Sequence, residues 1–238
     1  MLSRIESNSA EPVAKRVFQA LRQAIVTMQF SPGQPLSEQE VATQLGVSRQ
    51  PVREAFIKLG ESGLVTIRPQ RGTFVVKISV KQVIDARFVR EAVEAAVARK
   101  AGEELPAGVV GDLRANLRAQ RAAAEDGTHE RFLDLDEAFH RTIALGIGCE
   151  YAWRVVEETK AQMDRVRYLS LPHATPLDRL IHQHEAIVDA IEARDPDGSE
   201  AAMRRHLREI LTSLPELEQR FPDLFDGAAA AARPTCAA

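Results

Sequence analysis

Three histidines and one aspartate interrupt the apolar stripes of segments whose hydrophobic residues recur every three or four positions. That spacing predicts amphipathic helices with the stripe turned toward a core, so the four side chains should point inward together. They are Asp136 and His140 on one predicted helix, His184 on a second and His206 on a third. Asp136 and His140 are four residues apart and are therefore neighbours on one helix face.

Two explanations account for polar groups at these inward positions. A single histidine on an apolar face is most often a core residue with satisfied hydrogen bonds. An aspartate and three imidazoles buried without partners would each cost several kcal/mol, whereas one divalent cation would satisfy all four. One carboxylate oxygen and three imidazole nitrogens suit Zn²⁺, with Ni²⁺, Mn²⁺ or Fe²⁺ as alternatives. We therefore expect a metal site at these four residues.

The elements that would position this site are all helical. From about residue 80 the sequence predicts helices only, separated by short turns rich in Gly, Pro and Asp. Their predicted bounds are about 80–102, 107–124, 129–146, 150–170, 177–193 and 199–214. We expect residues 79–215 to form an all-α helical bundle and residues 216–238 to form a partly disordered C-terminal tail.

Residues 1–78 have a different organisation. A helical pattern over residues 13–28 precedes two short predicted helices: Ser37 caps the first, which Gly46 ends, and Ser48 caps the second. Two β-branched runs around RPQRG then predict a hairpin with a basic tip. This order is that of a winged helix-turn-helix. The predicted fold is thus mainly α, with an N-terminal winged helix-turn-helix domain and a C-terminal all-α bundle.

Basic and polar side chains gather where such a domain would meet DNA. The start of the third helix carries Ser48, Arg49, Gln50 and Arg53, and the hairpin tip carries Arg68, Arg71 and Gly72. In a major groove, arginine matches guanine and glutamine can recognise adenine, while a helix N-terminus attracts phosphate. A solvated basic face is the other interpretation of the arginines, but the predicted hairpin favours DNA contact.

Composition agrees with a DNA-binding segment joined to a different domain. The chain has 238 residues and a net charge of −3, yet residues 1–78 carry +4 and the rest −7. The basic first part favours a polyanionic partner. No segment has the roughly 20 apolar residues of a membrane span, and the start lacks the features of a signal peptide. The two cysteines, Cys149 and Cys236, lack metal-type spacing. We expect a cytoplasmic protein.

The segment PGQPLSEQEVATQLGVSRQPVREAFIKLGESGLVTIRPQRGTFV resembles the GntR family of bacterial transcription regulators. The resemblance covers about residues 12–77 and depends on LGVSRxPVREA followed by GLV and RGTFV. The residues that it implies touch DNA are Ser48, Arg49, Gln50, Arg53 and Gly72. Gln50 stands where Thr is more usual in the family, so the base preference beside it can differ.

The second half resembles the FCD ligand-sensing domain of the FadR subfamily. The matching segments are RFVREAVEAAVARKA, DLDEAFHRTIA, HQHEAIVDAIEARD and AAMRRHLR, over about residues 80–214. The resemblance implies metal ligands at the positions of Asp136, His140, His184 and His206, which are the four residues that interrupt the apolar stripes.

Two arginines are candidates for binding an effector. Arg90 lies on the inward stripe of the first bundle helix, where it could pair with an acidic neighbour or bind a carboxylate with two hydrogen bonds. The resemblance favours the second role, because its counterpart lines the effector pocket. Arg165, in MDRVRYLSLP, is the other candidate, whereas Arg167 could simply be exposed.

These features predict a ligand-responsive DNA-binding transcription regulator. We expect a repressor that binds a palindromic operator as a homodimer and is released by a small organic acid, of the sugar-acid type by resemblance, bound next to the metal. Two alternatives stay open: a metal-dependent hydrolase, in which the ion activates water, and a regulator for which the metal is the signal. No HExxH, GxSxG or Walker motif is present, so we expect no enzyme activity.

Overall fold

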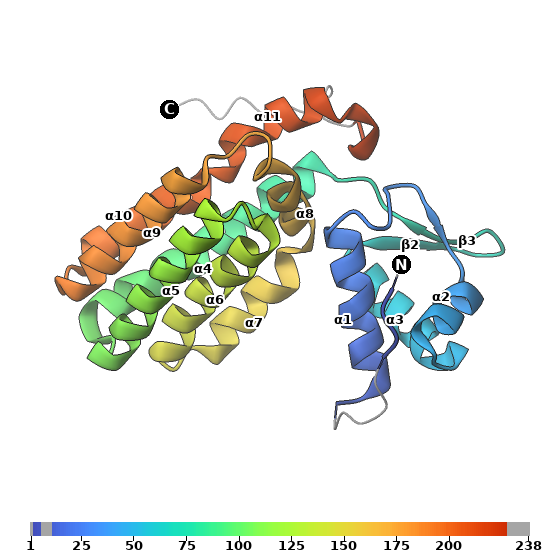
Figure 1. Cartoon of the computed structure of the whole chain (residues 1–238), viewed down its shortest axis with the longest axis horizontal. Coiled ribbons are helices and arrows are strands. Elements are labelled where there is room, and N and C mark those ends of the chain that lie inside the picture. The colour runs from blue at the N-terminus through green and yellow to red at the C-terminus, as the bar shows by residue number, and fades with distance from the viewer. Residues whose placement is uncertain (1, 6–10, 228–238) are drawn as a thin grey trace. The chain divides into compact units, whose positions relative to one another are not determined.

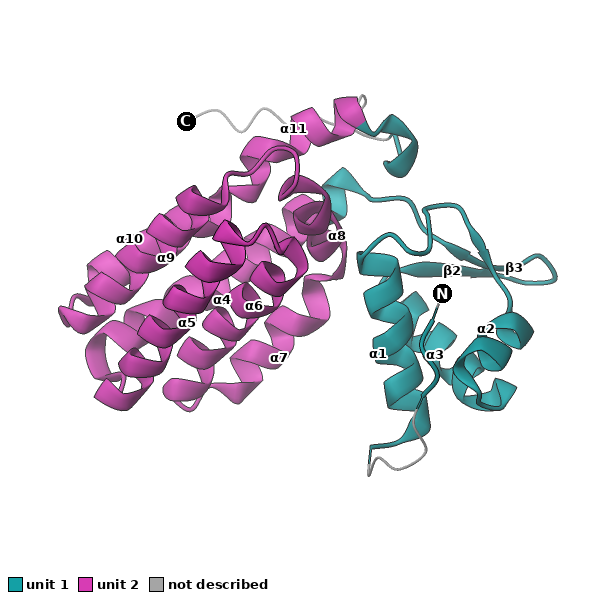
Figure 2. Ribbon diagram, in the orientation of Figure 1, with its two compact units in different colours: residues 1–82, 221–238 teal, residues 83–220 magenta. Residues whose placement is uncertain are grey.

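The computed structural model describes residues 2–5 and 11–227, which form two compact units (Figures 1 and 2). Unit 1 comprises residues 1–82 and 221–238, and unit 2 comprises residues 83–220. The boundaries therefore lie a few residues after those expected from the sequence, at 82/83 and 220/221. The residues that follow the last long helix belong with unit 1, so the chain passes between the units twice.

Unit 1 contains the predicted winged helix-turn-helix (Figure 1). Its main elements are α1 (Val13–Val26), β1 (Pro35–Leu36), α2 (Glu38–Leu45), α3 (Arg49–Glu61), β2 (Val65–Arg68) and β3 (Gly72–Val75). The strands form an antiparallel sheet in the order β1-β3-β2, with Ile67 opposite Thr73. The sequence predicted the hairpin but not β1, because two residues become a strand only through pairing with β3.

Local sequence signals explain how α2 and α3 begin and end. The backbone N–H of Glu40 donates to Oγ of Ser37, and Gly46 ends α2 in the left-handed region at φ +70°. Ser48 precedes α3, but its hydroxyl makes no capping hydrogen bond. The predicted cap therefore forms at Ser37 only.

Unit 2 is the predicted helical bundle. Its helices are α4 (Val80–Glu104, which begins in unit 1), α5 (Ala107–Glu125), α6 (His129–Gly146), α7 (Glu150–Thr159), α8 (Ala161–Ser170), α9 (Leu177–Glu192), α10 (Pro196–Arg208) and α11 (Ile210–Arg220). The predicted helix over residues 150–170 is interrupted at Lys160, whose buried ammonium contacts Glu137 and Asp164. The apolar pattern continues across this break, so its periodicity did not indicate it.

The core of unit 2 forms between helices that are distant in the chain. Helix α9 packs against α5 and α10, and α5 packs against α6 (Figure 1). The largest buried apolar side chains include Phe139, Trp153 and Met203. Gly102 lets α4 approach the start of α10, since an added Cβ would lie 2.8 Å from the Cα of Pro196. These contacts bring inward-facing residues of α4, α6, α9 and α10 together.

The segment after α11 pairs with the residues that precede α4. A 3₁₀ helix, η1 (Pro222–Leu224), leads to backbone hydrogen bonds in which Ile78 donates to Leu224 and Asp226 donates to Ile78. Phe225 is buried there. Of the tail expected over residues 216–238, residues 228–238 lie outside the described residues. Every helix in the described part of the chain is too short or too polar to cross a membrane.

Candidate metal centre and pocket

The four predicted metal ligands converge in the interior of unit 2. Asp136 and His140 come from α6, His184 from α9 and His206 from α10, and each offers one ligand atom within 4.8 Å of the other three. The Nε2 atom of His206 lies 3.2 Å from Nε2 of both His140 and His184. Oδ1 of Asp136 lies 3.6 Å from Nε2 of His184. Ligand atoms around a tetrahedral Zn²⁺ at its usual bond lengths would be about 3.3 Å apart, so this spacing suits such an ion.

A hydrogen-bond chain assigns the tautomer of His184. Asn116 donates from Nδ2 to the carbonyl oxygen of Leu135, which can only accept, so Oδ1 of Asn116 faces Gln120. Gln120 therefore donates its Nε2 to Asn116 and presents Oε1 to Nδ1 of His184, at 2.8 Å. Since Oε1 can only accept, Nδ1 of His184 carries the proton. Its Nε2 then directs a lone pair at the site.

The same argument applies to the other two histidines. Gln183 donates from Nε2 to the carboxylate of Glu209, so its Oε1 accepts from Nδ1 of His206, at 3.1 Å. Nδ1 of His140 lies 2.5 Å from Oε2 of Glu94. Three Nε2 lone pairs therefore meet beside a carboxylate, and they repel one another unless a cation lies between them. This donor set fits a divalent metal ion.

Burial holds two of the histidines in the protonation state that binds metal. It lowers the pKa of His184 to about 3 and lowers the pKa of His206 well below its ordinary value. Burial alone would raise the pKa of Asp136, but the positive charge of Arg167 outweighs this and holds that pKa well below its usual range. Neutral imidazoles and an ionised carboxylate are the states that a metal ion requires.

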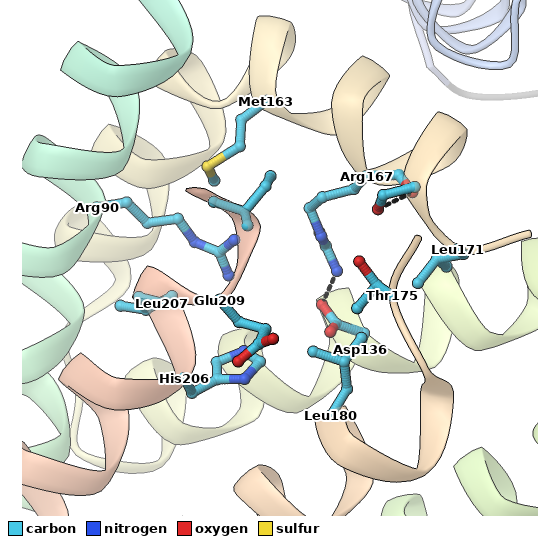
Figure 3. Close-up of a pocket in the computed structure, with 12 residues that line it drawn as sticks. Arg90, Asp136, Met163, Arg167, Leu171, Thr175, Leu180, His206, Leu207 and Glu209 are labelled. Carbon is cyan, nitrogen blue, oxygen red and sulfur yellow. Dashed lines mark hydrogen bonds and ion pairs between the residues drawn. The ribbon is translucent and has the colours of Figure 1, made fainter. Parts of the chain in front are cut away.

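A pocket opens beside the cluster and lies wholly within unit 2 (Figure 3). It is lined by Arg90, Asp136, Met163, Arg167, Ser170, Leu171, Thr175, Leu180, His206, Leu207, Glu209 and Ile210. Figure 3 shows the guanidinium groups of Arg90 and Arg167 entering it from different sides. Arg167 donates to Oδ2 of Asp136, one of the candidate ligands. The pocket thus places two cationic forks next to the candidate metal centre.

Of the two arginines predicted to bind an effector, the structure places one in the pocket. Arg90 lines it and donates from Nε to Oε1 of Glu94. Arg165 is fully buried, donates to Gln162, and is not among the lining residues. Arg167, for which exposure was one interpretation, lines the pocket instead. Both arginines lie in α8, where the apolar pattern alone did not decide which of two positions two residues apart faces the pocket.

The sequence did not identify the residues that contact the Nδ1 atoms of the three histidines. Glu94, Gln120 and Gln183 each contact the Nδ1 atom of one ligand. Glu94 had a detectable signal, because it follows Arg90 by four residues and so faces the same side of α4. Gln120 also had one, because it continues the apolar stripe of α5 three residues after Leu117 and is fully buried. Gln183 had none, because it lies beside the stripe of α9, where polar residues are common.

The seven predicted DNA-contacting residues are all exposed on unit 1. Arg49 and Arg53 both pair with Glu38 at the start of α2, with nitrogen–oxygen distances of 3.0 and 3.1 Å. Hydrogen bonds from Arg53, with Arg49 also contributing, hold the pKa of Glu38 below its ordinary value. The side chain of Gln50 donates to Glu54. Glu38 therefore positions the two arginines beside the N-terminus of α3.

The hairpin tip carries the remaining basic candidates. The Arg68 guanidinium lies 5.3 Å from the centroid of the Phe74 ring, a cation–π contact. Arg71 follows in the turn, and its backbone N–H donates to the carbonyl of Arg68. Gly72 has φ +102°, a backbone conformation that favours glycine. The tip is thus a defined turn with two exposed arginines.

Comparison with known proteins gives matches for both units. The protein-family model described as "Bacterial regulatory proteins, gntR family" matches residues 13–75, and the protein-family model described as "FCD domain" matches residues 85–209. Over 218 residues the chain is 44% identical to the HTH-type transcriptional repressor RspR of Escherichia coli K12, covering 92% of this chain and 96% of RspR.

Two further matches are more distant. The chain is 32% identical over 183 residues to a probable D-xylose utilization operon transcriptional repressor of Paenarthrobacter nicotinovorans, covering 75% of this chain and 78% of that protein. The solved structure of Escherichia coli McbR/YncC is similar with a TM-score of 0.76 at 20% identity, covering 89% of this chain and 99% of that one. At this identity the structural match shows the fold alone.

Proposed function

The chain belongs to the GntR family of bacterial regulatory proteins and carries an FCD domain, and from this membership we propose a transcriptional repressor that a small organic acid releases from its operator. GntR regulators bind DNA, so the chain is a DNA-binding regulator and not an enzyme. Repression is carried over from the 44% identical relative, whose name describes it as a repressor. The acid is proposed to bind in the pocket of unit 2, beside a divalent metal ion held by Asp136, His140, His184 and His206.

The convergence of three Nε2 lone pairs is the observation that carries the metal proposal. Zn²⁺ titration of chelator-treated protein should give one bound ion per chain and a higher unfolding temperature, because a ligand that binds only the folded state stabilises it. His184→Gln should remove most of this effect. His182→Gln is the matched control, since His182 is exposed on the same helix. Equal zinc binding by both variants would contradict the assignment.

The arginines support an anionic effector. When bound, the metal would supply positive charge for a carboxylate oxygen, and Arg90 and Arg167 would supply hydrogen bonds to the same group. Ser170, Thr175 and Glu209 add hydroxyl and carboxylate groups to the lining, which suit the hydroxyls of a sugar acid. The pocket therefore favours a hydroxylated carboxylic acid over an apolar one.

An operator gel shift with zinc-loaded protein tests the release step. D-gluconate should weaken operator binding, and Arg90→Gln should make the complex insensitive to it. If an acid binds in calorimetry but leaves operator affinity unchanged, the coupling of acid to DNA is refuted. Comparing operator affinity with and without chelator, in the absence of acid, tests the alternative in which the metal itself is the signal.

A homodimer is the proposed operator-binding form. Two apolar side chains one turn apart on α4, Ile84 and Phe88, are 43% and 67% exposed, and a second copy of the chain would cover them. A two-fold dimer would present two α3 helices to a palindromic operator, with half-sites about 34 Å apart or a multiple of that distance.

A further inference from the structure

We propose that Glu94 is a positioning residue shared by the metal centre and the acid-binding arginine. One of its carboxylate oxygens holds Arg90, and the other orients His140 toward the ion. This inference depends on the proposed function, because it concerns the same site, and it assigns a task to a residue that is not itself a ligand.

The contacts of Glu94 carry the proposal. Glu94 is 5% exposed on α4, where its Oε1 accepts from Nε of Arg90. Its Oε2 lies 2.5 Å from Nδ1 of His140 on α6. Within the part of the chain that the structure describes, neither Oε2 of Glu94 nor Nδ1 of His140 has a hydrogen-bond partner of regular geometry, so the 2.5 Å contact between them is the polar contact that the structure gives to both. The orientation of the His140 ring therefore depends on this carboxylate.

The three histidines differ in what holds them. His184 and His206 each face the amide oxygen of a glutamine, whereas His140 faces a carboxylate. A negative charge at Nδ1 increases the electron density at Nε2 and strengthens its bond to a cation, and such outer partners commonly change metal affinity by about 10–100-fold. Glu94 should accordingly contribute more to metal affinity than either glutamine.

The shared carboxylate also links two functions. The Nε atom of Arg90 is used by Glu94, which leaves the remaining nitrogens of the guanidinium directed into the pocket (Figure 3). Glu94 thus holds Arg90 in the position from which it can meet an acid, while holding a ligand of the metal that the same acid would approach. A purely structural carboxylate would neutralise Arg90 and would have no effect on the metal.

Zinc affinity without any acid separates these two roles. We would measure it on the full chain by competition with a chromophoric chelator, comparing Glu94→Gln with Glu91→Gln. Glu91 is the matched control, because it is also buried on α4 and paired with arginines, including Arg208 at 2.6 Å, yet it contacts none of the histidines. Glu94→Gln should weaken zinc binding about 10–100-fold, and Glu91→Gln should change it by less than about threefold.

A second pair of variants covers the case in which Glu94→Gln alone fails to fold. Arg90→Gln with Glu94→Gln removes both buried charges together and leaves neither unpaired. If Glu94 orients His140, the double variant should bind zinc about 10–100-fold more weakly than Arg90→Gln alone. Equal zinc affinity in this pair, or in the Glu94 and Glu91 variants, would overturn the proposal while leaving the metal centre intact. If the unaltered chain bound no zinc, the proposed metal centre would fall, and this inference with it.

Discussion

Acidification should destabilise unit 2 of the metal-free protein, because His184 and His206 are buried as neutral imidazoles. Burial lowers the pKa of His184 to about 3, whereas a histidine of the unfolded chain has a pKa near 6.5. As the pH falls, the unfolded state therefore takes up protons first. The contribution of His184 to stability is fully present above about pH 6.5 and is lost progressively between about pH 6.5 and pH 3.

The size of this effect follows from proton linkage. Between pH 7 and pH 5 an unfolded histidine becomes almost fully protonated, while His184 stays neutral. The free energy of unfolding should fall by about 2 kcal/mol for His184 alone, and His206, whose pKa burial also lowers, should add to this loss. That loss is a large part of the roughly 5–15 kcal/mol by which folded proteins are usually stable.

Urea unfolding in the presence of chelator measures this loss. The single tryptophan, Trp153, is 6% exposed in α7 and reports on unit 2. His184→Gln should reduce the loss between pH 7 and pH 5 by about 2 kcal/mol, and the exposed His182→Gln should leave it unchanged. If the unaltered chain lost less than about 1 kcal/mol, or if His184→Gln lost as much as the unaltered chain, the burial of neutral imidazoles would be refuted.

Three further predictions concern other parts of the chain. Gly102→Ala should lower the unfolding free energy by about 1–3 kcal/mol, because its Cβ would lie 2.8 Å from neighbouring atoms. Gly108→Ala is the control, since Gly108 has open space around it and its substitution should not destabilise the protein. Similar melting temperatures for the two variants would contradict the close packing of α4. Arg49→Ala should weaken specific operator binding by about 1–3 kcal/mol with helical content unchanged, and unaltered affinity in a gel shift would exclude Arg49 from recognition. Phe88→Asp should convert a dimer to monomer in sedimentation, and a dimer of unchanged affinity would place the interface elsewhere.

Local patterns predicted most of the fold because the features involved depend on neighbouring residues. Three such features each form within a few residues: the capping hydrogen bond at Ser37, the left-handed conformation of Gly46 and the hairpin turn before Gly72. The period of three and four also predicted which faces of the helices are buried. Since the inward positions of α6, α9 and α10 share one core, this period predicted that Asp136, His140, His184 and His206 lie close together, as they do in the structure.

The sequence by itself thus determined the two domains, the convergence of the four candidate metal ligands and the exposed basic side chains. The tertiary structure decided what surrounds them. Arg167 and not Arg165 lines the pocket, a choice that the apolar pattern of α8 left open and the packing of this helix decided. Glu94, Gln120 and Gln183 acquire their roles only through contacts between helices that are distant in the chain, and one-dimensional periodicity contains no information about such pairs. A repeating pattern specifies which way a side chain faces, but its partner depends on how whole helices pack.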